Sequence, residues 1–90
     1  MEIKGIFQEH PNHSYLVIDL KYIVDLGLEN LISRYSFYND DHAFLEEDSD
    51  ALLFMNKSKE LGYSFNYTTT VKDYTLNSRH LNRFVGKQTA

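Results

Sequence analysis

The chain has no cysteine and no tryptophan, and it has one proline and four isolated glycines in 90 residues. The lack of cysteine excludes a disulfide framework, a thiol nucleophile and thiolate metal ligands. Isolated glycines give no glycine-rich phosphate-binding loop. No apolar run approaches the roughly 18–20 residues of a membrane span, and the N-terminal residues lack the basic and apolar regions of a signal peptide. We therefore expect a cytoplasmic protein.

What the chain does contain is typical of one small globular domain. Hydrophobic residues make up 42% of the sequence, charged residues 24%, and the formal net charge is −4. A chain of this length can bury one modest core but has no second domain to form a deep active-site cleft. We expect a protein that is not an enzyme and needs no cofactor.

The N-terminal third predicts a β-hairpin followed by a short helix. Apolar and β-branched residues indicate strands over residues 2–8 and 14–18, and His10–Pro11–Asn12–His13 is typical of a turn. Asp19 fits a helix N-cap and Gly27 a C-terminal glycine, which predicts a helix over 20–26. The alternative is one long strand over 14–24, because Tyr, Val and Ile dominate that stretch.

The central and C-terminal parts predict a second hairpin, a helix and a last strand. The predicted strands cover 31–38, 42–46 and 63–71, and the helix covers 49–61. Asp48, Ser49 and Asp50 offer oxygens to cap that helix, and Gly62 ends it. The alternation after Gly62 puts Tyr63, Phe65 and Tyr67 on one face, which we interpret mainly as core.

These elements predict an α+β domain of two layers, with a mainly antiparallel sheet and two helices on one face. The order is strand, strand, helix, strand, strand, helix, strand. We assign residues 1–71 to this domain and residues 72–90 to a less regular basic tail, in which Leu81, Phe84 and Val85 are spaced for one helical turn.

Carboxylates are concentrated between residues 40 and 50, where six of eleven residues are acidic. Turn and capping chemistry explains many of them. A calcium loop starting at Asp48 lacks the required glycine and final glutamate. The remaining interpretation is an acidic surface that binds a basic partner. The predicted partner-binding residues are Asp40, Asp41, Glu46, Glu47 and the tyrosines Tyr35 and Tyr38.

Charge of opposite sign collects at the C-terminal end. Residues 72–90 carry a net charge of +3 and residues 1–71 a net charge of −7. Arg79, Arg83 and Lys87 are therefore candidates for contacts with a nucleic-acid backbone, although so sparse a set makes nucleic acid the weaker alternative.

The histidines are the candidates for a metal site. His10 and His13 lie three residues apart, and His42, His80 or a carboxylate would have to complete their coordination of a zinc ion. Nothing in the spacing requires this, so we assign no metal ligands and keep a metal-binding protein or metal-dependent enzyme as an alternative function.

Three stretches in the middle of the chain, Ile32–Phe37, Ala43–Ala51 and Lys59–Gly62, with Phe54, resemble a group of small proteins of bacteria and their phages or plasmids. That group has no activity or site residue to carry over. The resemblance implies an accessory protein of a mobile element, a class that includes inhibitors of host defence such as anti-CRISPR and antirestriction proteins.

The sequence thus predicts a small acidic protein-binding module, as a monomer or as a homodimer joined through a sheet edge. Its expected partner is a protein with a basic surface, such as a nucleic-acid-binding protein. We expect no membrane partner.

Overall fold

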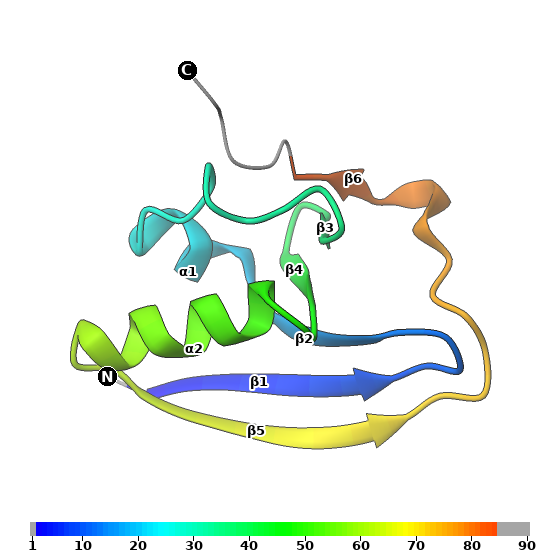
Figure 1. Cartoon of the computed structure of the whole chain (residues 1–90), viewed down its shortest axis with the longest axis horizontal. Helices are drawn as coiled ribbons and strands as arrows, with labels where there is room; N and C mark the ends of the chain where they lie inside the picture. The colour runs from blue at the N-terminus through cyan, green and yellow to red at the C-terminus, as the bar shows by residue number, and fades with distance from the viewer. Residues whose placement is uncertain (1, 85–90) are drawn as a thin grey trace.

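The computed structural model describes residues 2–84 as one α+β domain, as the sequence predicts. Six strands form one sheet, and two α-helices lie in the chain between them (Figure 1). The strands are β1 (Glu2–Glu9), β2 (Ser14–Asp19), β3 (Phe37–Tyr38), β4 (His42–Glu46), β5 (Ser64–Val71) and β6 (Asn82–Arg83). The helices are α1 (Leu20–Asp25), α2 (Asp50–Glu60) and the short 3₁₀ helix η1 (Ser78–His80).

The strand order across the sheet is β5-β1-β2-β4-β3-β6, and every pair except β1–β5 is antiparallel. The parallel pair arises because α2 carries the chain back to the start of β1, so that Ser64 lies beside Glu2 and Val71 beside Glu9. The structure confirms the predicted hairpins and the mainly antiparallel sheet.

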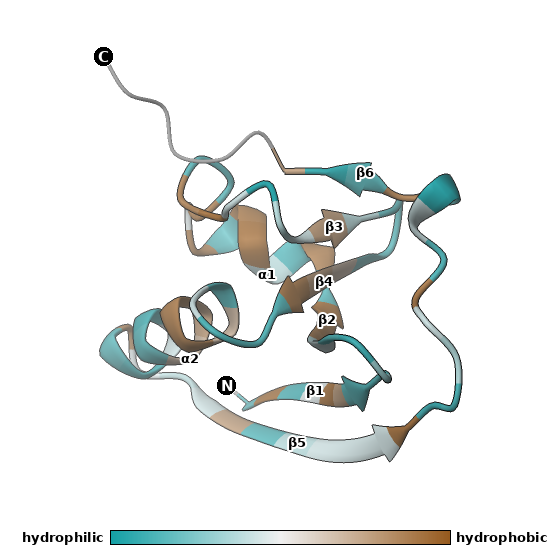
Figure 2. Ribbon diagram, turned by 45° about the vertical axis from the view of Figure 1, so that its right-hand side comes forward, coloured by the Kyte–Doolittle hydropathy of each residue, from teal (hydrophilic) through white to brown (hydrophobic). Residues whose placement is uncertain are grey.

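One face of the sheet carries the core. Alternate residues of β1 and β2 point toward the helices, so Ile3, Leu16 and Ile18 are buried against Ile23 of α1 and Phe54 of α2. Figure 2 shows the hydrophobic segments of α1, β2 and β4 next to one another in the centre of the molecule. Both helices therefore cover the same face, which gives two layers.

Helix α1 begins and ends as its sequence predicts. The side chain of Asp19 accepts a hydrogen bond of 3.0 Å from the backbone N–H of Lys21. Gly27 follows the helix with a φ of 69°, a conformation that glycine adopts without steric cost. The alternative of one strand over 14–24 is wrong, because β2 ends at Asp19.

Two other predicted elements differ in the structure. The strand over 31–38 is reduced to Phe37–Tyr38, because the N–H of Leu31 and of Ile32 both bond back to the carbonyl of Leu28 in a turn. The predicted helical turn at Leu81 and Phe84 is also wrong, since β6 occupies residues 82–83 and pairs with β3; Val85 lies outside the described residues.

The chain after Val71 takes part in the fold. Residues 72–77, which we call the strap, run from β5 to η1 across the end of the β1–β2 hairpin (Figure 1). Phe84 is buried in the same core as Ile23. The strap and β6 thus connect the two edges of the sheet. Among residues 2–84, no helix is long and apolar enough to span a membrane.

Candidate functional site

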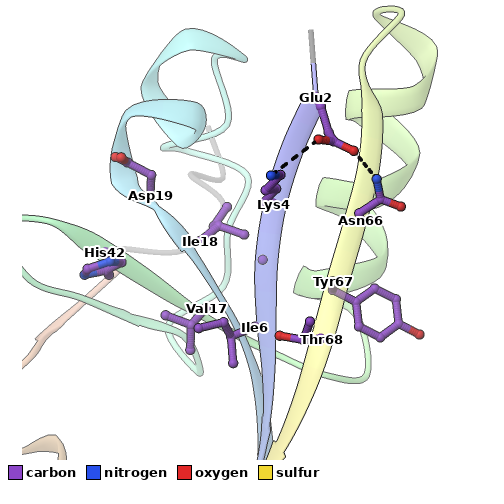
Figure 3. Close-up of a pocket in the computed structure, with 11 residues that line it drawn as sticks. Glu2, Lys4, Ile6, Val17, Ile18, Asp19, His42, Asn66, Tyr67 and Thr68 are labelled. Atoms are coloured by element: carbon purple, nitrogen blue, oxygen red, sulfur yellow. Dashed lines mark hydrogen bonds and ion pairs between the residues drawn. The ribbon is translucent and has the colours of Figure 1, made fainter.

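The sheet face opposite the helices carries an open groove of about 630 Å³. Its floor contains Ile6, Val17 and Thr68, which point to the same side of their strands while α2 lies behind them (Figure 3). Register explains the grouping, because Ile6 is the Cα partner of both Val17 and Thr68. Ile6 keeps 43% of its surface exposed, so the groove has an apolar floor that solvent reaches.

Charged and polar side chains border one side of this floor, toward the start of β1. Lys4 lies 3.9 Å from a carboxylate oxygen of Glu2, and Glu2 also accepts a hydrogen bond from Asn66. The β1–β2 register places Asp19 at the level of Lys4, and Asp19 and His42 are Cα partners across β2 and β4. An apolar floor with few polar groups around it is the usual composition of a binding groove.

A second, smaller hollow of about 360 Å³ continues from the groove, since Asp19 and His42 line both. Leu20, Lys21, the exposed Val24, Asp40 and Asp41 complete it, so one lysine lines this hollow beside the carboxylates. Asp19, Asp40 and Asp41 form what we call the acidic corner. Their carboxylates are exposed, and within residues 2–84 the ion pairs are Lys4–Glu2 and Lys57–Glu60, neither of which includes the corner.

The acidic corner is held by the turn before β4. The side chain of Asn39 accepts hydrogen bonds from the N–H of Asp41 (2.9 Å) and of His42 (2.7 Å). The carbonyl of Asp41 accepts a hydrogen bond from the N–H of Leu20 at the start of α1. Backbone groups thus fix the corner. Within the described residues the carboxylates of Asp40 and Asp41 accept no hydrogen bond, whereas that of Asp19 already accepts one from the N–H of Lys21.

The other predicted carboxylates have internal roles. Glu46 accepts hydrogen bonds from the backbone N–H groups of Asp48, Ser49 and Asp50 and from the hydroxyl of Ser49. Burial raises the pKa of Glu46, but these hydrogen bonds outweigh it and hold the pKa below its usual value. Glu46 thus accepts from the first N–H of α2. Of the three residues predicted to offer capping oxygens, Ser49 occupies the N-cap position but makes no side-chain capping hydrogen bond.

Asp50 is also internal, with 3% of its surface exposed. Its carboxylate accepts hydrogen bonds from the hydroxyls of Ser33 (2.6 Å) and Ser36 (2.5 Å) and from the N–H of Ser33. It ties α2 to the loop before β3.

The acidic segment is consequently not one surface. Asp41 precedes β4 and Glu47 follows it, and the five extended residues between them place them about 20 Å apart. Glu47 and Asp48 are exposed at the end of β4 that lies away from the groove.

The two predicted tyrosines lie in different surroundings. Tyr35 is 70% exposed and lines a hollow with Glu46, Asp48 and the strap. Tyr38 is half-buried, and its ring lies 4.8 Å from that of Phe84. Tyr35 thus belongs to the Glu47 end of β4, and Tyr38 mainly supports the core.

The basic residues of the C-terminal part do not gather into a patch within the described chain. Arg83 donates a hydrogen bond of 2.8 Å to the carbonyl of Arg34 and lies over the ring of Phe37 at 4.8 Å. Arg79 is exposed on η1, and Lys87 lies outside the described residues.

The histidines are also kept apart. His10 is 8% exposed; its Nδ1 donates to the carbonyl of Tyr74 at 2.7 Å, and its Nε2 lies 3.3 Å from Oε1 of Gln8. His13 and His42 stand at opposite ends of β2, about 20 Å apart. No group of three or more potential metal ligands occurs within residues 2–84.

No family of known proteins, no curated protein and no solved structure matches this chain.

Sequence reasoning missed the groove itself. A signal for it exists in β2, where Tyr15, Leu16, Val17 and Ile18 are all apolar or aromatic. This pattern indicates that β2 has apolar side chains on both faces of the sheet and not on the core face alone. In β1, Ile6 interrupts the polar face that Glu2, Lys4 and Gln8 otherwise form. Together these residues indicate an apolar strip on the face away from the helices.

Proposed function

We propose that this protein is a small protein-binding module whose interface is the open groove together with the acidic corner. The observation that supports it most strongly is the continuity of the two: Asp19 and His42 belong to both, so apolar surface at Ile6 runs directly into exposed carboxylates. An apolar centre with a charged border is typical of protein interfaces.

The chemistry of the partner follows from these surroundings. Ile6 and Val17 offer a floor for one apolar side chain. Beside it, the three carboxylates of the acidic corner outnumber the one lysine of the hollow, Lys21, and favour a lysine or arginine of the partner. Exposed charges of one sign also speed the encounter with a basic surface. The partner we propose is therefore a protein with a basic surface and an apolar side chain at its centre.

The wider role predicted from the sequence, an accessory protein that inhibits a host-defence or nucleic-acid-binding protein, remains part of the proposal. A basic nucleic-acid-binding surface would match the acidic corner in charge. Occupying that surface would block nucleic acid without any catalytic step.

Charge reversal at the two ends of β4 tests the proposal. The D40K/D41K variant reverses two of the three carboxylates of the acidic corner, and the E47K/D48K variant makes the same change of net charge, from −4 to 0, at the far end. All four side chains are exposed, so both variants should fold. We expect D40K/D41K, but not E47K/D48K, to lose the proteins that co-purify with the wild type in the native host.

A further inference from the structure

The outer edge of β5 is a long strand edge that no described residue covers. β5 and β6 are the two ends of the sheet, and β5 has eight residues where β6 has two. In Figure 1, β5 runs along the lower boundary of the molecule with no labelled element beyond it. Its sequence, SFNYTTTV, contains no charge and no proline, the two features that usually prevent a strand edge from pairing.

The backbone groups on this edge follow from one hydrogen bond. The N–H of Lys72 donates to the carbonyl of Glu9 at 2.7 Å, so the backbone of Lys72 faces β1. Successive residues of a strand turn their N–H and C=O groups to opposite sides. The outward-facing groups are therefore those of Phe65, Tyr67, Thr69 and Val71.

We propose that β5 pairs antiparallel with β5 of a second copy of this chain, around a two-fold axis at Thr68. This register places Tyr67 opposite Thr69 of the other copy and Phe65 opposite Val71. These are hydrogen-bonded pairs, so the N–H and C=O groups of all four outward-facing residues find partners. The register is self-complementary, as a two-fold interface must be.

Side chains agree with this register on both faces of the sheet. On the helix side, the exposed Tyr67 (55%) and Val71 (75%) meet Thr69 and Phe65, and aromatic residues opposite β-branched ones stabilise antiparallel pairs. On the open side, Thr68 meets Thr68 and Asn66 meets Thr70. The one charged neighbour, Lys72, falls opposite Ser64, so no like charges oppose each other.

A second copy fits this edge because its two-fold register places aromatic side chains opposite β-branched ones and opposes no like charges, while it also satisfies every outward-facing backbone group. The dimer would join the two open faces into one continuous surface with two grooves. The inference does not depend on the proposed function, since it needs no other protein and is measured on the purified chain alone.

Cysteine substitution tests the register directly, because the wild-type chain contains no cysteine. In the proposed dimer, the two Thr68 Cα atoms form a non-hydrogen-bonded pair about 4.5 Å apart, a separation that a disulfide spans. The two Thr70 Cα atoms, on the same face, would be roughly 13 Å apart. We expect T68C to form a covalent dimer under mild oxidation and T70C, the matched control, to remain mostly monomeric.

Sedimentation of the wild type provides the second measurement. We expect its mass to rise from 10.6 kDa toward twice that value as concentration increases. T68K and T68E should each stay monomeric, because they place like charges opposite each other, and an equal mixture should recover the dimer. A wild-type mass that stays at 10.6 kDa at every concentration, or equal cross-linking of T68C and T70C, would overturn the proposal.

Discussion

The carboxylate of Asp50 accepts a hydrogen bond of 2.5 Å from the hydroxyl of Ser36, which joins the first turn of α2 to the loop before β3. The same hydroxyl oxygen accepts a hydrogen bond from the N–H of Glu46 at the end of β4. Ser36 is fully buried, so this small network fixes the relative positions of a helix, a strand and a loop.

Removing Asp50 should therefore destabilise the whole domain. The substitution Asp50→Ala leaves the N–H of Ser33 and the hydroxyl of Ser36 without their acceptor, at a cost of about 2–4 kcal/mol in the free energy of unfolding. Urea denaturation measures this change. Asp48→Ala, which alters an exposed neighbour, should change stability by less than about 0.5 kcal/mol. Equal changes in the free energy of unfolding for the two substitutions would show that the hydrogen bonds of Asp50 do not stabilise the domain.

Glu46 should make stability depend on pH in the acid range. Its pKa in the folded protein is lowered, so the stabilisation it provides is fully present above the ordinary value of about 4.3 and is lost as the pH falls through the lowered folded value. Glu46→Gln removes this titrating group. We expect the variant to lose less stability than the wild type when unfolding is measured at decreasing pH.

Glu47→Gln is the control for this measurement, because Glu47 is exposed and accepts no hydrogen bond in the described structure. Its pH profile should follow that of the wild type. A Glu46→Gln profile that also follows the wild type would contradict the assignment of Glu46 as the acceptor for the first N–H of α2.

His10 should hold the strap against the β1–β2 hairpin. Besides its hydrogen bond to the carbonyl of Tyr74, its ring makes edge contacts with the rings of Tyr15 (6.1 Å) and Tyr74 (5.6 Å). His10→Ala removes these contacts, and we expect the strap amide of Lys72, which donates to the carbonyl of Glu9, to exchange with solvent faster while the amides of β2 remain protected.

His13→Ala is the matched substitution in the same turn, because His13 is exposed. It should leave exchange in the strap unchanged. Uniformly faster exchange throughout the sheet in His10→Ala would mean instead that His10 supports the whole fold and not the strap in particular.

Sequence reasoning succeeded where local chemistry decides the structure. Helix α1 is bracketed by Asp19 and Gly27, and β5 alternates over eight residues, so both could be placed from neighbouring residues alone. The strand predicted over the apolar residues Leu31 and Ile32 was wrong, because the backbone N–H groups of these residues donate to the carbonyl of Leu28 in a turn. The pairing of β6 with β3 depends on distant residues, which no local pattern encodes.

The candidate site was only partly predictable for the same reason. Asp40 and Asp41 are exposed, and their position beside Asp19 follows from the β2–β4 register. Glu46 and Asp50 belong to the same acidic stretch, yet their hydrogen bonds direct them inward. Asp41 and Glu47 are close in sequence but lie at opposite ends of β4. The groove, in contrast, brings together residues 6, 17 and 68, which are far apart in sequence.

Comparison of the two charge-reversed proteins as bait tests the proposed interface most directly. Wild type, D40K/D41K and E47K/D48K each serve as bait to capture proteins from the native host, after circular dichroism has shown that all three are folded. The proposed interface predicts proteins that bind wild type and E47K/D48K but not D40K/D41K, with binding that weakens as salt increases. Identical sets of proteins on all three baits would contradict it.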